Sequence, residues 1–138
     1  MEPLKVILDT NLWISYLITQ TLSDLDDLVV NHKIKFLFSP ESTSEFIEVA
    51  NRPKFKKYFS EEDVFNLLVY MDKFCELVEL NSEFDICRDK KDNFWLSLSW
   101  DGEADYLVTG DTDLLVLSSF RGTKILTIQE FLKEVQSL

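Results

Sequence analysis

The sequence predicts an α/β domain with a central parallel sheet and helices on both faces. Short apolar runs alternate with helical patterns along nearly the whole chain. Each return from one parallel strand to the next needs a long crossover, and a helix is the usual one. The 138 residues, 46% of them hydrophobic, are enough to bury a core, and no repeat or Pro/Gly/Ser-rich linker divides them. We therefore expect one domain over residues 1–138.

The N-terminal half contains two predicted strands, each followed by a helical pattern. The first strand is predicted at LKVIL (4–8), and after Asp9 the apolar residues return at helical spacing. A second helix is expected behind a Ser23 cap, with one apolar face formed by Leu25, Leu28, Val29 and His32. The second strand is predicted at IKFLFS (34–39), and a further helical pattern covers SPESTSEFIEV (39–49).

The C-terminal half continues the alternation. A capping box is predicted at SEED (60–63), and the helix behind it has an apolar face formed by Val64, Leu68, Met71 and Cys75. The next strands are predicted at CELVEL (75–80) and DYLVTG (105–110), with an apolar helix between them that begins at NFWL (93–96). A weaker fifth strand is predicted at KIL (124–126), and the last helix opens with TIQE (127–130), which has capping-box spacing.

Two of the predicted strands end in an aspartate, namely Asp9 and Asp111. Each aspartate could serve as a turn or cap residue, and Asp113 could cap the LLVL segment. If the two strands are neighbours, however, both carboxylates lie at the carboxyl edge of the sheet, where open α/β sheets bind ligands. Two carboxylates about 4 Å apart repel each other by roughly 4 kcal/mol at an effective dielectric near 20, and a divalent cation removes that cost.

Further carboxylates stand near two other predicted helix starts. Glu41, Glu45 and Glu48 share one helical face, and Asp89 and Asp92 precede an apolar helix. Spacing does not choose among these five, because each could be a solvated or capping residue. A site built from carboxylates, without a His or Cys cluster, suits Mg²⁺ or Mn²⁺ better than Zn²⁺.

Several other functional classes lack their motifs. Three glycines provide no P-loop and no GxGxxG turn, and one histidine gives no support to a Ser-His-Asp arrangement. We expect His32 to pack at a helix end, and Cys75 and Cys87 to be free thiols. No run approaches the ~18 apolar residues of a membrane span, and the N-terminus lacks a signal-peptide pattern. We therefore expect a cytoplasmic protein without a membrane contact.

The formal net charge of −11 is unusual for a protein that binds nucleic acid. Seven of the 14 basic residues, however, fall into two runs, RPKFKK (52–57) and RDKK (88–91), near the predicted acids. The basic side chains that could contact a nucleic-acid strand are Arg52, Lys54, Lys56, Lys57, Lys90 and Lys91. Phe55, Tyr58 and Phe59 could stack on bases, although core packing explains them better.

Four motifs together resemble those of the PIN domain family. They are LDTN after the first strand, SPESTSEF, RDKKDN and ADYLVTGDTDLL. The resemblance covers the chain from Lys5 to the last helix, and it points to the bacterial branch related to VapC toxins of toxin–antitoxin systems. It implies a three-layer α/β/α sandwich with a five-stranded parallel sheet. It further implies a Mg²⁺- or Mn²⁺-dependent nuclease that hydrolyses RNA, with a cognate antitoxin and a second copy of the chain as partners.

The resemblance also selects site residues. Four acids match the family's metal-binding and catalytic positions: Asp9, Glu45, Asp92 and Asp111. Asp113 matches an accessory metal-binding acid, and Asn11 and Thr109 match polar positions that support the metal site. This branch often has a more acidic run where the chain has Lys90 and Lys91, so Asp89 stays an alternative to Asp92.

Two other functions stay open. A PIN-fold module could bind RNA or protein without catalysis, but the presence of all four matched acids argues against that reading. A haloacid-dehalogenase-like phosphatase also places an aspartate after its first strand. Such an enzyme needs a second aspartate two residues later as its acid and base, and this chain has Asn11 there.

Overall fold

The computed structural model describes residues 2–19 and 23–136, and only the backbone of residues 23 and 24. In chain order the elements are β1 (Leu4–Leu8), α1 (Thr10–Thr19), α2 (Ser23–Val30), β2 (Ile34–Phe38), α3 (Pro40–Ala50), the 3₁₀ helix η1 (Pro53–Phe55), α4 (Glu61–Phe74), β3 (Glu76–Leu77), the 3₁₀ helix η2 (Lys90–Asp92), α5 (Asn93–Asp101), β4 (Tyr106–Val108), α6 (Thr112–Leu115), β5 (Ser119–Phe120), β6 (Thr123–Leu126) and α7 (Ile128–Val135). None of the helices in these described ranges is long and apolar enough to cross a membrane.

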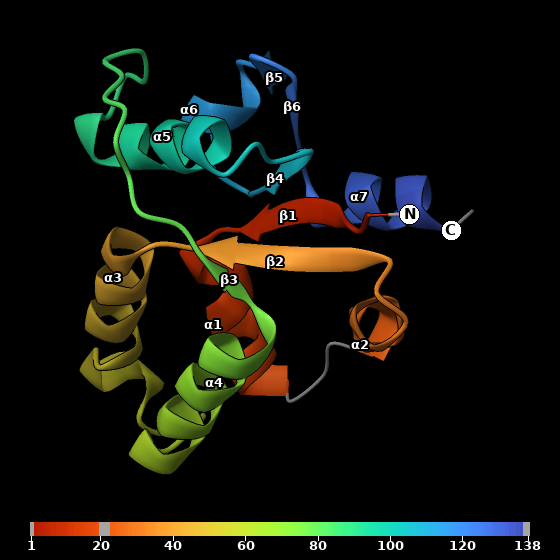
Figure 1. Ribbon diagram of the computed structural model, residues 1–138. Coiled ribbons are helices and arrows are strands. Elements are labelled where there is room, and N and C mark those ends of the chain that lie inside the picture. Colours follow the sequence, from red (N-terminus) through yellow and green to blue (C-terminus); the bar gives the residue numbers. More distant parts are fainter. Residues whose placement is uncertain (1, 20–22, 137–138) are drawn as a thin grey trace.

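The strands form one sheet in the order β3-β2-β1-β4-β6-β5. All neighbouring pairs are parallel except β5 and β6, which are antiparallel. Figure 1 shows α1, α3 and α4 on one side of β1 and β2, and α5 and α6 on the other side. The predicted α/β fold with helices on both faces of a central sheet is therefore confirmed, and the sheet is mostly parallel where a parallel one was predicted.

In the described part of the chain the sheet has six strands, so the predicted number of five is wrong. The additional strand is β5, which is only two residues long and leaves no periodic pattern in the sequence. It returns to β6 through Arg121 and Gly122, whose φ angles of 48° and 94° are both positive, as expected for a two-residue hairpin loop. The predicted strand at 75–80 is also shorter than expected, because only Glu76 and Leu77 pair with β2.

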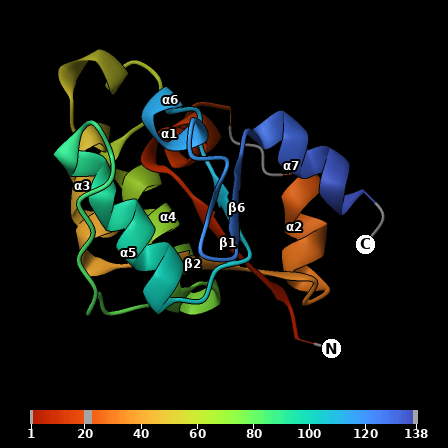
Figure 2. The same cartoon turned by 90° about the horizontal axis from the view of Figure 1, so that it is seen from above.

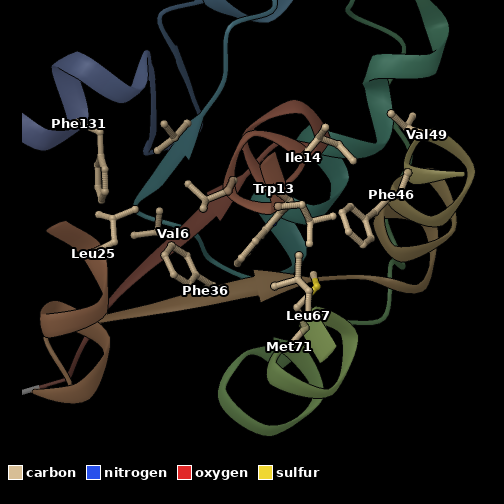
Figure 3. Close-up of a cluster of buried hydrophobic side chains, with 14 of the residues drawn as sticks. Val6, Trp13, Ile14, Leu25, Phe36, Phe46, Val49, Leu67, Met71 and Phe131 are labelled. Carbon is tan, nitrogen blue, oxygen red and sulfur yellow. The ribbon is translucent and has the colours of Figure 1, made fainter. Parts of the chain in front are cut away.

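Successive residues of the central strands point to opposite faces of the sheet, and each face has its own core. Val6 and Phe36 pack into the larger core with α1, α3, α4 and α7, whereas Ile7 and Leu37 pack into a second core under α5. Figure 3 shows the larger core, in which Trp13 of α1 lies against Phe36. Their ring centroids are 5.3 Å apart in an edge-to-face arrangement. The sheet is therefore buried on both sides, as its apolar strand sequences require.

Two of the predicted helix caps are present in the structure. Ser60 with Asp63 and Thr127 with Glu130 form the two predicted capping boxes. The Ser23 cap lies outside the described side chains. The expectation that His32 packs at a helix end is wrong, since α2 ends at Val30 and His32 is exposed with a φ of 57°. The chain turns there into β2, so the apolar spacing of α2 does not continue to residue 32.

Gly102 ends α5 at a position with no space for a side chain. A Cβ atom there would lie 2.7 Å from Leu37 Cδ1 and 2.9 Å from the carbonyl oxygen of Leu98. We therefore expect Gly102→Ala to lower the free energy of unfolding by about 1–3 kcal/mol, as measured by urea denaturation. Gly110→Ala is the matched control, because a Cβ there meets no atom within 4 Å. Equal stability of the two variants would contradict this assignment.

Candidate acidic active site

Asp9 follows β1 and is almost completely buried, with 6% of its surface exposed. Its carboxylate accepts three hydrogen bonds: Oδ2 from the Thr109 hydroxyl (2.6 Å) and the Gly110 N–H (3.3 Å), and Oδ1 from the Leu12 N–H (3.1 Å). Burial raises the pKa of Asp9 above its ordinary value, and the three hydrogen bonds oppose that rise because they favour the charged form. The buried carboxylate is thus held in one orientation at the edge of the sheet.

Thr109 connects Asp9, which follows β1, to Asp111, which follows the neighbouring strand β4. Since β1 and β4 are adjacent in the sheet, their carboxyl ends lie side by side. The Thr109 hydroxyl donates to Asp9 and accepts from the Asp111 N–H at 3.0 Å. Asp111 is the N-cap of α6, and its Oδ1 accepts the Asp113 N–H at 2.8 Å. The predicted proximity of Asp9 and Asp111 is what the structure shows.

Asp92 lies at the start of α5 and faces the same place. One carboxylate oxygen each from Asp92, Asp111 and Asp113 lie within 4.8 Å of one another. Burial, a hydrogen bond to Asp111 and the charge of Asp111 together raise the pKa of Asp92 to about 7. Asp89, in contrast, is exposed and accepts the Lys91 N–H as the cap of η2. The geometry therefore places Asp92, and not Asp89, at the acidic cluster.

Glu45 reaches the site from α3. It is half-buried and accepts a hydrogen bond from the Thr10 hydroxyl of α1. Glu41 and Glu48 are exposed and border a neighbouring hollow rather than the acidic cavity. Sequence reasoning missed Thr10, although its position between Asp9 and Asn11 in the LDTN motif was a signal for it.

Most of these side chains line one open cavity of about 200 Å³, referred to below as the acidic cavity. Its lining comprises Asp9, Thr10, Asn11, Glu45, Val49, Arg52, Asp92, Trp95, Thr109, Asp111 and Leu114. Six of the seven residues predicted to bind or support a metal ion are among these. The seventh, Asp113, does not line the cavity but belongs to the carboxylate cluster beside it. Four segments far apart in the sequence thus contribute carboxylates to one opening.

Only some of the predicted basic side chains border this cavity or the hollows next to it. Of the residues predicted to contact nucleic acid, Arg52 lines the acidic cavity, Lys91 lines the hollow next to it and Lys90 lines a further one. Lys54, Lys56 and Lys57 are exposed on the segment after α3 but border none of these three spaces. Arg88, which sequence reasoning did not select, places Nε 3.6 Å from Asp113 Oδ1.

The aromatic residues near the first basic run divide between core and surface. Phe59 is buried and Phe55 is half-buried in the larger core, and their rings stack with centroids 5.7 Å apart. Tyr58 is 51% exposed, and Lys57 Nζ lies 5.1 Å from the centroid of its ring. The preference for core packing therefore fits Phe55 and Phe59, and Tyr58 alone faces solvent.

The raised pKa of Asp92 predicts a pH dependence of stability. The folded state holds this proton up to about pH 7, whereas the unfolded chain releases it near pH 3.8. Without metal, the free energy of unfolding should therefore fall as the pH rises from about 4 to about 7 and then level off. Because solvent screens this partly exposed group, we expect a change on the order of 1 kcal/mol, or about 3 °C in Tm. Thermal unfolding in EDTA measures it.

The matched control for this pH series is Asp92→Asn, which removes the titrating group. The variant should lose the part of the pH dependence that lies between pH 4 and 7. A decline of equal size in the variant would assign the effect to other groups.

Comparison with known proteins identifies the family to which this arrangement belongs. A sequence profile of the PIN domain matches residues 5–113, which is most of the chain. The chain belongs to the PIN domain family. This PIN domain is also 31% identical over 117 residues to the uncharacterized protein MJ1680 of Methanocaldococcus jannaschii, an alignment that covers 83% of the chain and 75% of MJ1680.

Two solved structures share the fold of this PIN domain. VapBC2 from Rickettsia felis, bound to a DNA fragment from its promoter, aligns with a TM-score of 0.61 and 15% identity over 88% of this chain and 97% of that one. PAE2754 from Pyrobaculum aerophilum aligns with a TM-score of 0.63 and 12% identity over 98% and 91% of the two chains. At these identities the similarity shows a common PIN fold.

Proposed function

We propose that this PIN domain is a metal-dependent endoribonuclease that hydrolyses phosphodiester bonds of RNA at the acidic cavity. The observation that carries the proposal is the convergence of Asp9, Glu45, Asp92 and Asp111 on one open cavity, with Asp113 beside it. Carboxylates that serve only as caps have no reason to converge from four segments of the chain. Burial, together with the hydrogen bond to Asp111 and its charge, raises the pKa of Asp92, which is typical of functional sites.

The donor set fits Mg²⁺ or Mn²⁺. All candidate ligands are carboxylate oxygens, and the described part of the chain has no histidine at the site. Asp92, Asp111 and Asp113 would hold the ion, and Asp9 and Glu45 line the same cavity as Asp92 and Asp111. Such an ion supplies Lewis-acid catalysis, since it promotes ionisation of water at neutral pH and offsets charge on a phosphate group.

The chain's own residues would do the positioning. Thr109 fixes the orientation of Asp9 and the backbone of Asp111, and Thr10 fixes Glu45. Arg52 is the one cation among the described lining residues of the acidic cavity, so it is placed to bind a phosphate oxygen of the substrate. Asn11 is exposed at the rim and can hydrogen-bond to water or to the strand.

An RNA substrate is supported by the basic side chains beside the site and by the family. Lys90 and Lys91 precede Asp92 directly, and the run from Arg52 to Lys57 follows α3. We further propose that the chain acts as a VapC-like toxin with a cognate antitoxin and forms a homodimer. The exposed apolar side chains of α4, Phe65 at 64% and Val69 at 48%, are consistent with a protein partner.

The direct test is to incubate the purified protein with single-stranded RNA and Mg²⁺ or Mn²⁺. We expect internal cleavage that EDTA prevents, and no turnover of p-nitrophenyl phosphate, which a phosphatase would hydrolyse. A DNA strand of the same sequence is the matched control for the sugar. Binding of RNA and of Mn²⁺ without any cleavage product would contradict the proposal and favour a non-catalytic binding module.

A further inference from the structure

We propose that Phe94 and Glu41 form a base-binding subsite next to the acidic cavity, in which Phe94 stacks on one base of the RNA and Glu41 selects guanine. This inference rests on the proposed ribonuclease function and concerns the sequence preference of the same site. It would make the enzyme cut near guanine in single-stranded RNA.

The subsite lies in a groove that continues from the acidic cavity between α3 and α5. These two helices contact each other and run side by side in Figure 2. A first hollow shares Glu45 with the acidic cavity and also contains Glu41, Lys91 and Phe94. A second hollow shares Glu41 and Phe94 with the first. A strand that reaches the acidic cavity can therefore continue along α3 without leaving the groove.

The distance along α3 suits a neighbouring nucleotide. Glu45, at the acidic cavity, and Glu41, at the subsite, are four residues apart on the same helix, which corresponds to about 6 Å. On the side of α5, Phe94 follows Asp92 by two residues. On both α3 and α5, the subsite residue therefore lies within about one helical turn of a candidate catalytic acid.

Phe94 provides a fixed aromatic surface. Its ring packs on the buried Trp95 with the centroids 4.5 Å apart, and its side chain also borders both hollows. The ring is therefore held in place by Trp95 and also borders the groove. Stacking on such a ring binds any base, because every base has a π face.

The charged residues of the groove differ in the part of a nucleotide that they can bind. Lys91 borders the first hollow and Lys90 the second, and both are exposed, so each can bind a phosphate of the strand. Glu41 borders both hollows together with Phe94 and is exposed. A carboxylate repels phosphate but accepts hydrogen bonds from base N–H groups. The base is therefore expected on the Glu41 side of the groove.

Guanine is the base that fits one carboxylate best. Its Watson–Crick edge presents two adjacent donors, N1–H and the N2 amino group, and the two oxygens of a carboxylate can accept both at once. Adenine, cytosine and uracil present one donor there or a donor next to an acceptor. Hydrogen bonds to a charged acceptor are also the stronger kind, so the preference for guanine should be measurable.

The test maps cleavage sites in a pool of single-stranded RNA with randomised sequence, for the wild type, Glu41→Gln and Phe94→Leu. The wild type is expected to cut about tenfold more often where guanine occupies one fixed position near the cut. Glu41→Gln should reduce this preference to about twofold or less. Phe94→Leu keeps an apolar side chain for packing on Trp95 but removes the π surface, and it should weaken binding of all sequences about tenfold.

Binding provides a second readout that does not depend on turnover. Fluorescence anisotropy of labelled RNA is measured in the Asp111→Asn background, with and without the two substitutions. Glu79→Gln and Phe74→Leu are the matched controls, since both residues are exposed and border none of the described hollows.

The outcomes separate this inference from the proposed function. Cleavage with no preference for guanine, or with an unchanged preference in Glu41→Gln, would overturn the subsite and leave the ribonuclease proposal intact. Absence of any cleavage would overturn the proposed function. In that case a guanine preference in binding that is lost in Glu41→Gln would still support the subsite, and equal binding of all sequences would overturn it.

Discussion

Asp111→Asn is expected to lower the rate of RNA cleavage by at least about 10³-fold without destabilising the metal-free protein. Loss of one proposed metal ligand would remove several kcal/mol of metal-dependent stabilisation of the transition state, which corresponds to this factor. The side-chain carbonyl oxygen of the introduced asparagine can still accept the hydrogen bond that Asp113 N–H donates to Asp111 in the wild type. Its amide group can donate to Asp92, so a hydrogen bond between the two side chains no longer requires a proton on Asp92.

The measurements for this prediction are a cleavage assay, thermal unfolding in EDTA and calorimetric titration with Mn²⁺. We expect metal affinity and cleavage to fall together while the Tm stays equal or rises. Asp72→Asn makes the same chemical change at an exposed position of α4 and should alter none of these quantities. Cleavage by Asp111→Asn at the wild-type rate would remove Asp111 from the catalytic set.

Asp9 is a less suitable position for this test, although sequence reasoning favours it equally. Both oxygens of Asp9 already accept hydrogen bonds from N–H or O–H groups. An asparagine there would turn its amide toward at least one donor, and a buried unsatisfied pair of donors costs about 1–3 kcal/mol. Loss of activity in Asp9→Asn would therefore combine a change of chemistry with a change of stability.

Phe36→Ala is expected to lower the free energy of unfolding by about 3–5 kcal/mol, which is a large part of the 5–15 kcal/mol typical of a domain. Phe36 is 1% exposed in the larger core, where its ring meets Trp13. Truncation to alanine removes the apolar surface and leaves a cavity between β2 and α1. Urea denaturation with a linear extrapolation measures the change.

Phe65→Ala is the matched control for Phe36→Ala, because it makes the same substitution at a side chain that is 64% exposed. It should change the free energy of unfolding by no more than about 0.5 kcal/mol. Losses of similar size in the two variants would mean that Phe36 does not carry the packing between the sheet and α1.

The fold class and the acidic strand ends were predictable from local patterns in the sequence. The central strands are buried on both faces, so they appear as unbroken apolar runs, and Asp9 and Asp111 stand out where those runs stop. The sequence predicted that Asp9 and Asp111 lie close together only if their two strands are neighbours, since local patterns do not give the order of strands in a sheet. The neighbouring positions of β1 and β4 satisfy that condition.

The choice among the helical acids was not predictable from spacing. Phe46 and Val49 are buried in the larger core and set the rotation of α3 about its axis. This rotation directs Glu45 into the acidic cavity and leaves Glu41 and Glu48 outside it. The resemblance to PIN domains selected Glu45, whereas the residues alone left three candidates.

The hydroxyl of Thr109 joins a carboxylate that lies 100 positions earlier in the chain to the backbone of Asp111. A growing polypeptide on the ribosome contains Asp9 long before it contains Thr109 or Asp111. No ordering of the first hundred residues can assemble the complete set of acids. The proposed nuclease would therefore stay inert during its own translation until almost the whole domain has been synthesised, and the RNA around it would not meet a half-made enzyme.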